Sequence, residues 1–343
     1  MFVRNLWYVA AWASEVTDGL LGRMLLDESV LLYRLKDGSP VAIGNRCPHR
    51  FAPLSEGRKC EDDSIECPYH GLRYDATGAC VVNPHEDGKI PRAARVASYP
   101  LVERYGVLWI WMGNVALANP DDIAVFDQIT DPGYRTVTGL TAINANYELI
   151  ADNLLDLSHT QFVHANFARA DDVLKVRHEV TQDGNTVHSR RWIPGIIGPK
   201  SFTRSLPDAQ AKVDHWIRVR WDAPGLHRLD VGVVPAGVSE AQGLRREGSH
   251  LLTPATRTST HYFYASSRNY RQDDPLEDEA IREWHRVGFG EQDKPMIESV
   301  QRMMGDHDLM SLKPILLPVD TAAVRARRVM DSLRACQSGQ KAA

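Results

Sequence analysis

The sequence lacks several features that mark common classes of protein. No apolar run approaches the roughly 18 residues of a membrane-spanning helix. Basic residues do not outnumber acidic ones, and a net charge of −4 provides no positive field for a nucleic-acid backbone. No G-x-G-x-x-G motif follows a strand pattern, so the chain is not expected to bind a dinucleotide itself. We therefore predict a cytoplasmic protein with no membrane partner and no nucleic-acid partner.

Cysteine is also scarce. The chain has five cysteines among 343 residues, and an odd number in an intracellular chain of this size argues against a disulfide framework. Four of them fall in the first quarter of the chain: Cys47, Cys60, Cys67 and Cys80. Cysteines that cluster with histidines in a cytosolic protein indicate a metal site more often than a disulfide. We therefore expect a metal site in this quarter.

The length of the chain indicates two domains, at roughly 100–200 residues per domain. The first third carries short strand patterns separated by turn signals, such as "SVLLYRL" and "PVAIGN" on either side of "KDGS". The Pro/Asp-rich "NPDD" segment (119–122) marks a break. We predict a first domain over residues 1–120 and a second over residues 121–343.

The second part of the chain combines helical and strand patterns. Helical periodicity occupies residues 146–164, about 275–305 and 321–336. Between the first two helical stretches, five strand-like segments are typical of successive antiparallel strands. A β domain followed by a helix, an antiparallel sheet and a long helix is an α+β protein.

The segment "CPHRFAPLSEGRKCEDDSIECPYHG" (47–71) has the spacing C-x-H-x₁₇-C-x-x-H. Each of its two loops supplies one thiol and one imidazole: Cys47 with His49, and Cys67 with His70. A finger-type zinc site groups its cysteines together and its histidines together. One of each per loop instead favours a [2Fe–2S] cluster, in which one iron takes both cysteines and the other takes both histidines. A structural zinc site is the alternative.

A second group of metal-binding residue types lies in "ADNLLDLSHTQFVH" (151–164), which contains Asn153, Asp156, His159 and His164. Non-haem iron(II) enzymes that use O₂ hold the metal with two histidines and one carboxylate. On an ideal helix His159 and His164 lie about 140° apart, so the helix is predicted to loosen or end between them, near residues 160–162. Spacing alone does not choose the carboxylate among five candidates, Glu291, Asp293, Glu298, Asp306 and Asp308.

The segments "NRCPHRFAPLSEG" and "ECPYHGLRYDATGACV" closely resemble the Rieske non-haem iron oxygenases. "MFVRNLWYVAA" and "SSRNY" resemble the aromatic O-demethylase branch of that family, which includes vanillate and dicamba monooxygenases. The resemblance covers almost the whole chain and is weakest over residues 165–245. It implies a Rieske β-sandwich domain (1–120) followed by a helix-grip, START-like catalytic domain (121–343).

The resemblance also implies the ligands of a second metal. The family pattern D/N-N-x-x-D-x-x-H-x₄-H matches from Asn153 through Asp156 to His159 and His164, which are then the ligands of a mononuclear iron(II). The segment "EQDKP" points to Asp293 as the third ligand. In the family the carboxylate at Asp156 bridges the iron-ligand histidine, here His159, and a Rieske histidine, here His70 of the partner subunit. That path requires a ring of subunits, and a homotrimer is expected.

The implied activity is that of a monooxygenase that uses O₂ and takes electrons from a separate flavin/iron–sulfur reductase or a ferredoxin. It would hydroxylate a methoxy methyl group of an aromatic, acid substrate, and the product would break down to a phenol and formaldehyde. The resemblance places His250 and Trp284 in the substrate pocket. Dicamba-type relatives have an amide side chain where this chain has Leu229, so the anchor for a substrate carboxylate is in question.

Two other functions stay open at this point. A sister oxygenase would hydroxylate a ring, an alicyclic substrate or an N-methyl group instead. A protein that only carries electrons would need the cluster but would have no use for His159 and His164.

Overall fold

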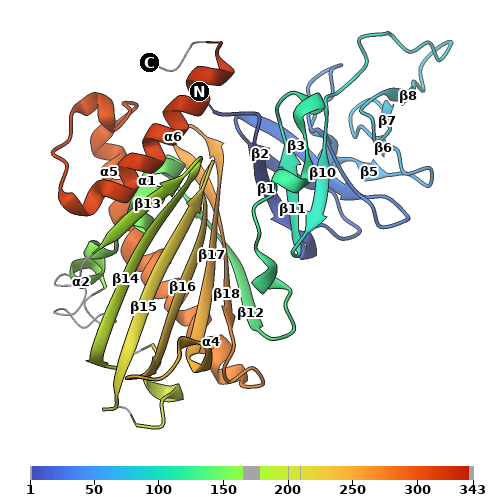
Figure 1. The fold of residues 1–343 in the computed structure, drawn as a ribbon. Coiled ribbons are helices and arrows are strands. Elements are labelled where there is room, and N and C mark those ends of the chain that lie inside the picture. Colours follow the sequence, from blue (N-terminus) through green and yellow to red (C-terminus); the bar gives the residue numbers. More distant parts are fainter. Residues whose placement is uncertain (1, 165–177, 200, 209, 340–343) are drawn as a thin grey trace. The chain divides into compact units, whose positions relative to one another are not determined.

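The computed structural model describes residues 2–164, 178–199, 201–208 and 210–339 (Figure 1). The chain divides into two compact units. Unit 1 comprises Met1–Ile123 with Thr253–Arg257, and unit 2 comprises Ala124–Leu252 with Thr258–Ala343. Within the described residues, no helix is both long enough and apolar enough to cross a bilayer.

Unit 1 consists of three small antiparallel sheets, with strand orders β1-β11-β10, β2-β3-β4-β9 and β5-β6-β7-β8. Its strands are β1 (Trp7–Trp12), β2 (Leu21–Leu25), β3 (Glu28–Arg34), β4 (Pro40–Gly44), β5 (Arg58–Lys59), β6 (Ile65–Glu66), β7 (Arg73–Tyr74), β8 (Cys80–Val82), β9 (Ser98–Tyr99), β10 (Leu101–Arg104) and β11 (Val107–Trp111). Single 3₁₀ turns are η1 (Ala13–Glu15), η2 (Leu54–Glu56), η3 (Val115–Leu117) and η4 (Pro120–Asp122).

The core of unit 1 forms where its strands are apolar on both faces. β1 and β11 pair with each other, and every residue of both strands is buried. Continuous rather than alternating hydrophobicity is the sequence pattern of strands covered on both sides. A second core cluster packs around the cysteine-bearing loops and includes Ile43, Leu54 and Tyr74. This cluster gives the two loops a rigid base.

Unit 2 is built on a seven-stranded sheet with the order β12-β18-β17-β16-β15-β14-β13. The strands are β12 (Arg135–Ile143), β13 (Glu179–Asp183), β14 (Thr186–Ile197), β15 (Lys212–Asp222), β16 (Leu226–Pro235), β17 (Leu244–Thr256) and β18 (Ser259–Arg268). Neighbouring strands from β13 to β17 follow one another in the chain and pair antiparallel, as the sequence predicts. Figure 1 shows helix α4 crossing one face of this sheet.

Within the described residues of unit 2 the helices are α1 (Tyr147–Leu155), α2 (Thr160–Val163), α4 (Pro275–His285), α5 (Lys294–Met304) and α6 (Thr321–Gln337), with a π-helix, η9 (Arg286–Asp293), between α4 and α5. The 3₁₀ turns are η5 (Asp127–Ile129), η6 (Leu157–His159), η7 (Thr203–Ser205), η8 (Glu240–Gln242), η10 (Met310–Leu312) and η11 (Pro318–Asp320). The α+β class and the antiparallel sheet with long C-terminal helices are confirmed. The stretch from 275 to 304 is helical throughout, but η9 interrupts its regular α-helical hydrogen bonding.

Polar side chains fix where the site-bearing helices begin. The Asn146 side chain accepts a hydrogen bond from the Glu148 N–H and caps α1, and Asp274 caps α4 in the same way through Leu276. Arg327 on α6 pairs with Asp152 on α1 at 2.6 Å. A largely buried ion pair of this kind contributes more to geometry than to stability. It holds α1, which leads into the metal-ligand segment, in one position.

Candidate metal centres

The first cysteine loop of unit 1 is closed by its own backbone. The Cys47 N–H donates to the Ala52 carbonyl at 3.0 Å, and the Phe51 N–H donates back to the Cys47 carbonyl at 2.9 Å. Phe51 has a φ of 62°. This left-handed conformation is uncommon for a residue with a side chain, and here it turns the chain back at the end of the loop.

The second cysteine loop repeats this pattern. The Cys67 N–H donates to the Leu72 carbonyl at 2.8 Å, and the Gly71 N–H donates to the Cys67 carbonyl at 3.1 Å. Gly71 has a φ of 69° and occupies the same place after its cysteine as Phe51 does after Cys47. The two loops therefore present their cysteines with matching backbone geometry, one on each side of a shared space.

The four predicted side chains meet between these loops. Cys47 and Cys67 are only 1% and 2% exposed, whereas His49 is exposed and His70 is half-buried. The His49 and His70 rings lie 4.4 Å apart between centroids, and neither cysteine forms a disulfide. Two buried thiols beside two outward imidazoles fit a two-iron cluster whose cysteine-bound iron is inside and whose histidine-bound iron is at the surface.

Two further residues touch this group, and the sequence analysis missed both. The Tyr74 hydroxyl lies 3.3 Å from the Cys47 sulfur. Burial raises the pKa of Tyr74, so the phenol keeps its proton and can donate to that sulfur. A nitrogen of the His85 ring lies 2.8 Å from the His70 carbonyl. The available signal for Tyr74 is that β7, the strand leaving the second loop, carries an aromatic residue with a polar end.

The second group lies in unit 2. The Nε2 atoms of His159 and His164 are 3.5 and 3.2 Å from a carboxylate oxygen of Asp293, and one ligand atom from each residue falls within 4.8 Å of the others. Asp293 is buried and both histidines are nearly so. Two imidazoles and one carboxylate on a single side of a site are the donor set of a non-haem iron(II) centre with open positions.

The departures from regular α-helix around the two histidines are not where the spacing predicted them. Residues 160–163 form the regular turn α2, so the predicted loosening near 160–162 is wrong. Helix α1 instead ends at Leu155, and Asp156 is extended, with φ −95° and ψ 102°. His159 then lies in the 3₁₀ turn η6, and His164 lies at the end of α2 with non-helical angles. Both ligands therefore leave the ideal helical positions, one before α2 and one after it.

Outer hydrogen bonds orient all three side chains. The Nδ1 of His164 lies 2.7 Å from the Gln292 amide oxygen, and the Nδ1 of His159 contacts the Asp156 backbone carbonyl, so each ring leaves Nε2 for a metal. The Asn153 amide donates to Asp293 at 3.4 Å. Such outer partners fix the ring orientation and tautomer of a metal-bound histidine.

One expected contact differs. The Asp156 carboxylate was expected to accept the outer N–H of His159, but the carbonyl of Asp156 occupies that place. The carboxylate instead accepts from the Ser158 N–H at 2.8 Å and caps η6. An aspartate at the first position of a helical turn commonly accepts such a hydrogen bond from a backbone N–H two residues later.

Asp293 is the last residue of the π-helix η9. Short π-helical segments inside α-helices are frequent at functional sites, because the extra residue changes which side chains face inward. Burial alone disfavours charge on His164, but its hydrogen bonds to Asp293 and Gln292 outweigh burial and raise its pKa. The same carboxylate that attracts a proton here would attract a metal cation.

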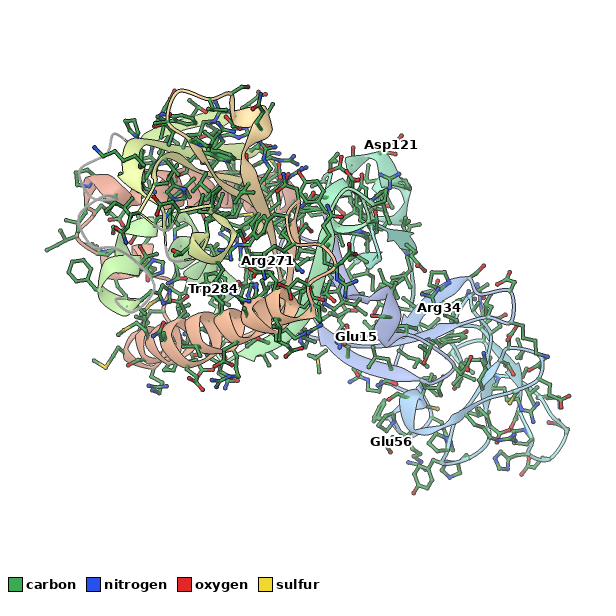
Figure 2. The ribbon with its side chains drawn as sticks, turned by 90° about the horizontal axis from the view of Figure 1, so that it is seen from below. Glu15, Arg34, Glu56, Asp121, Arg271 and Trp284 are labelled. Carbon is green, nitrogen blue, oxygen red and sulfur yellow. The ribbon has the colours of Figure 1, made fainter. Side chains whose placement is uncertain are left out.

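A cavity of about 480 Å³ opens beside these ligands within unit 2. The three residues predicted to contact a substrate, Leu229, His250 and Trp284, all line it. Its floor is the sheet, through apolar side chains of β15 and β16, and residues of helix α4 line it from the other side. One of these is Trp284, which Figure 2 labels. Phe289 stands edge-on to Trp284, with 5.0 Å between ring centroids. This is the shape and chemistry of a pocket for a flat aromatic ring.

Two neutral histidines lie in the floor of the cavity. Burial lowers the pKa of His227 to about 4 and that of His250 to about 3. The Nδ1 of His250 is 2.6 Å from the Tyr262 hydroxyl, while the Nε2 atoms of both rings have no hydrogen-bond partner among the described residues. Buried polar atoms are normally paired, so these two nitrogens are available to hydrogen-bond a group bound in the cavity.

Comparison with known proteins gives two domain matches. The Rieske [2Fe-2S] domain matches residues 6–100, and the vanillate O-demethylase oxygenase C-terminal domain matches residues 143–335. The oxygenase component of dicamba O-demethylase from Stenotrophomonas maltophilia is 40% identical over 332 residues, which cover 97% of this chain and 98% of that protein. The oxygenase component of chloroacetanilide N-alkylformylase from Rhizorhabdus wittichii is 39% identical and covers 97% and 95%.

Solved structures of dicamba monooxygenase agree with these matches. The complex with 3,6-dichlorosalicylic acid has a TM-score of 0.93 at 39% identity and covers 99% of both chains. The structure with non-haem iron and dicamba has a TM-score of 0.87 at 38% identity and covers 98% and 99%. The cofactors are thus a [2Fe–2S] cluster and a mononuclear iron, as predicted. The chain belongs to the Rieske non-haem iron oxygenases, as an oxygenase component of the vanillate and dicamba O-demethylase type.

Proposed function

We propose that this oxygenase removes the methyl group from a methoxy-substituted aromatic acid. One atom of O₂ hydroxylates the methyl carbon, and the other leaves as water with two electrons and two protons. The resulting hemiacetal breaks down to a phenol and formaldehyde. The observation that carries the proposal is the set of two histidines and one aspartate at the edge of a cavity whose walls fit an aromatic ring.

We assign the ligands as follows: Cys47, His49, Cys67 and His70 would hold the [2Fe–2S] cluster, and His159, His164 and Asp293 would hold the iron. When bound, the iron supplies the activation of O₂ and the cluster supplies electrons to it one at a time. The buried thiols and the inward-facing carboxylate support this assignment.

The side chains of the cavity would bind and orient the substrate. Leu229 and the neighbouring β15 and β16 residues exclude water from beside the iron site, which protects reactive species from side reactions. Trp284 and Phe289 would hold the ring in one plane. Asn153 would act on the metal through its hydrogen bond to Asp293 rather than by touching the substrate.

We further propose that the subunits form a homotrimer in which Asp156 contacts His70 of the partner subunit. Asp156 lines a second hollow of about 260 Å³, together with Ile315 and Leu316. Ile315 is 90% exposed, and the flanking Leu316 and Leu317 are also exposed. An apolar exposed segment beside a polar residue is typical of a protein contact surface. A head-to-tail contact must close into a ring, and three subunits are expected.

The electrons would come from a separate flavin/iron–sulfur reductase or ferredoxin, because the chain carries no dinucleotide motif of its own. We place the reaction in the cytoplasm, where thiols stay reduced, and the five cysteines are all free.

The test uses holoenzyme, a generic reductase, NADH and a panel of methoxybenzoates. One formaldehyde and one phenol released per O₂ consumed would support the proposal. A ring-hydroxylated or N-dealkylated product, without formaldehyde from any methoxy compound, would favour a sister oxygenase instead.

An Asp156→Asn variant that keeps both metals but does not turn over would support the path between subunits. An active Asp156→Asn variant would remove that path.

A further inference from the structure

Arg246 contributes a positive charge to the cavity wall. Its guanidinium lies over two aromatic rings, 5.1 Å from the centroid of Trp284 and 5.8 Å from that of Phe202. In the part of the chain that the structure describes, it makes no ion pair. Of the other charged side chains in the wall, Glu277 lies near Arg204 and Arg271, Glu283 pairs with Arg286, and Asp293 contacts His159 and His164.

The position of Arg246 in β17 places it on the same face as His250. Alternate residues of a strand share a face, so Arg246, Gly248 and His250 all point towards the cavity side of the sheet. Beside this group β16 presents the apolar Leu229 opposite Gly248 and the apolar Val231 opposite Arg246, and its one polar side chain in the cavity wall is the neutral His227 opposite His250. The positive charge of this part of the floor thus comes from β17.

Gly248 brings the two polar groups towards each other. A Cβ atom at Gly248 would lie 2.8 Å from the Nε2 of His250, so the imidazole leans over the glycine. That lean moves the unpaired Nε2 along the strand towards Arg246. Burial is the main cause that lowers the pKa of His250, and the proximity of His227 and Arg246 lowers it further. One small group above Gly248 could therefore touch both side chains.

Hydrogen bonding sets what His250 can offer. Burial raises the pKa of Tyr262 well above its usual range, so its phenol keeps its hydrogen and can donate a hydrogen bond to Nδ1 of His250, which lies 2.6 Å away. In a neutral imidazole the other nitrogen then carries the hydrogen. In this tautomer Nε2–H is a donor, and no hydrogen-bond acceptor for it is found among the described residues. A guanidinium and an N–H donor facing one space match the oxygens of a carboxylate or sulfonate.

We propose that Arg246 and His250 together bind the acid group of the substrate, with the aromatic ring against Trp284. The anion is held from strand β17, and the apolar Leu229 on β16 takes no part in holding it. This inference deepens the proposed function, because it names the residues that select an anionic substrate, but binding can be measured without turnover.

The test measures the binding of benzoates and their neutral benzamides to the anaerobic holoenzyme by calorimetry, with methoxy groups at each ring position. We expect the wild type to prefer the acid, and Arg246→Met to weaken acid binding by about 10–100-fold while leaving the amide unchanged. Methionine keeps the apolar contact with Trp284 but removes the charge. Arg246→Lys should recover part of the acid affinity, and His250→Phe should weaken acid binding independently.

Arg245 provides the matched control. It is the next residue, it also lies over a tryptophan, at 5.5 Å from Trp216, and it is paired with Glu240 and Asp230. Arg245→Met should leave binding of acid and amide unchanged. The proposal is overturned if the wild type does not prefer acids, or if Arg246→Met weakens acid and amide equally. Arg246-dependent acid binding without formaldehyde release would support this inference while contradicting the proposed demethylation.

Discussion

The two metal centres of this chain are built in opposite ways. In unit 1 each ligand-bearing loop is closed by its own backbone hydrogen bonds, from Cys47 to Ala52 and from Cys67 to Leu72. In unit 2 the proposed ligands His164 and Asp293 are 129 residues apart in the chain and meet only because helices pack on a sheet. The first centre depends on local turns, and the second depends on the fold of a whole unit.

The two proposed centres also differ in how far their ligand residues are buried. The cluster loops expose His49 at the surface, where an electron can enter or leave over a short distance. The mononuclear centre instead keeps Asp293 buried and opens to the cavity, while His159 also lines the second hollow beside Asp156. A centre that exchanges electrons needs a surface, whereas a centre that controls O₂ chemistry needs to exclude water.

The largest expected effects come from removing one ligand in each unit. Asp293→Ala should abolish the mononuclear iron and formaldehyde release while the visible absorbance of the cluster persists. Cys67→Ser should abolish that absorbance while unit 2 still takes up one iron. Iron and sulfide counts measure both. If either substitution emptied both centres, the two units would not assemble their metals independently.

A smaller effect is expected from Gln292→Ala. Loss of the outer partner of a metal-bound histidine typically lowers metal affinity by about 10–100-fold. Titration of the apo site with iron(II) measures the change. The neighbouring Glu291 is exposed and pairs with Arg286, so Glu291→Ala is the matched control and should leave the affinity unchanged. Equal loss in both variants would mean that η9 itself, rather than the Gln292 contact, sets the affinity.

The two units should also differ in their response to acid. Because the folded-state pKa values of His227 and His250 are about 4 and about 3, unfolded chains bind more protons than folded chains below the ordinary histidine pKa of about 6.5. The stability of unit 2 is therefore complete above about pH 6.5 and falls as the pH drops, by up to about 1.4 kcal/mol per pH unit for each histidine.

Urea unfolding between pH 7 and pH 5 tests this, with tryptophan fluorescence as the signal. His227→Gln should reduce the pH dependence of the free energy of unfolding by the contribution of one histidine. An unchanged slope in that variant would show that other groups cause the acid sensitivity.

The smallest expected effect tests the likeness of the two loops. Gly71→Ala should cost about 1 kcal/mol, because alanine is strained at a φ of 69° and its Cβ would lie 3.2 Å from Pro84. Phe51→Gly should not carry this cost, since glycine adopts a φ of 62° freely. The midpoint of thermal unfolding and the cluster content measure both. Equal loss in the two variants would mean that the loops are not equivalent.

The sequence predicted the local features well. The C-x-H and C-x-x-H spacing, the α+β order and the succession of antiparallel strands follow from patterns within a few residues of one another, where turn chemistry and strand periodicity dominate. The position of the helix break was wrong because Asp156 caps the following turn, and this local hydrogen bond ended α1 earlier than the histidine spacing suggested.

Long-range features were not predictable in the same way. Five carboxylates near the C-terminal helices looked alike, and only resemblance to the family selected Asp293. Arg246 was missed because its meaning depends on which residues β16 places opposite it and on the aromatic rings of Trp284 and Phe202. Strand register and the absence of a counter-charge are properties of the folded unit, not of the local sequence.

The widened turn of η9 bears on how this scaffold can change over time. Deleting one residue there would restore an ordinary helix and rotate Asp293 by about 100°. Such a shortened chain would gain regularity while its iron site lost an oxygen donor. At η9, selection for helix stability and selection for oxygenase activity therefore act in opposite directions. We expect an uninterrupted α-helix at this place in relatives that no longer act as oxygenases.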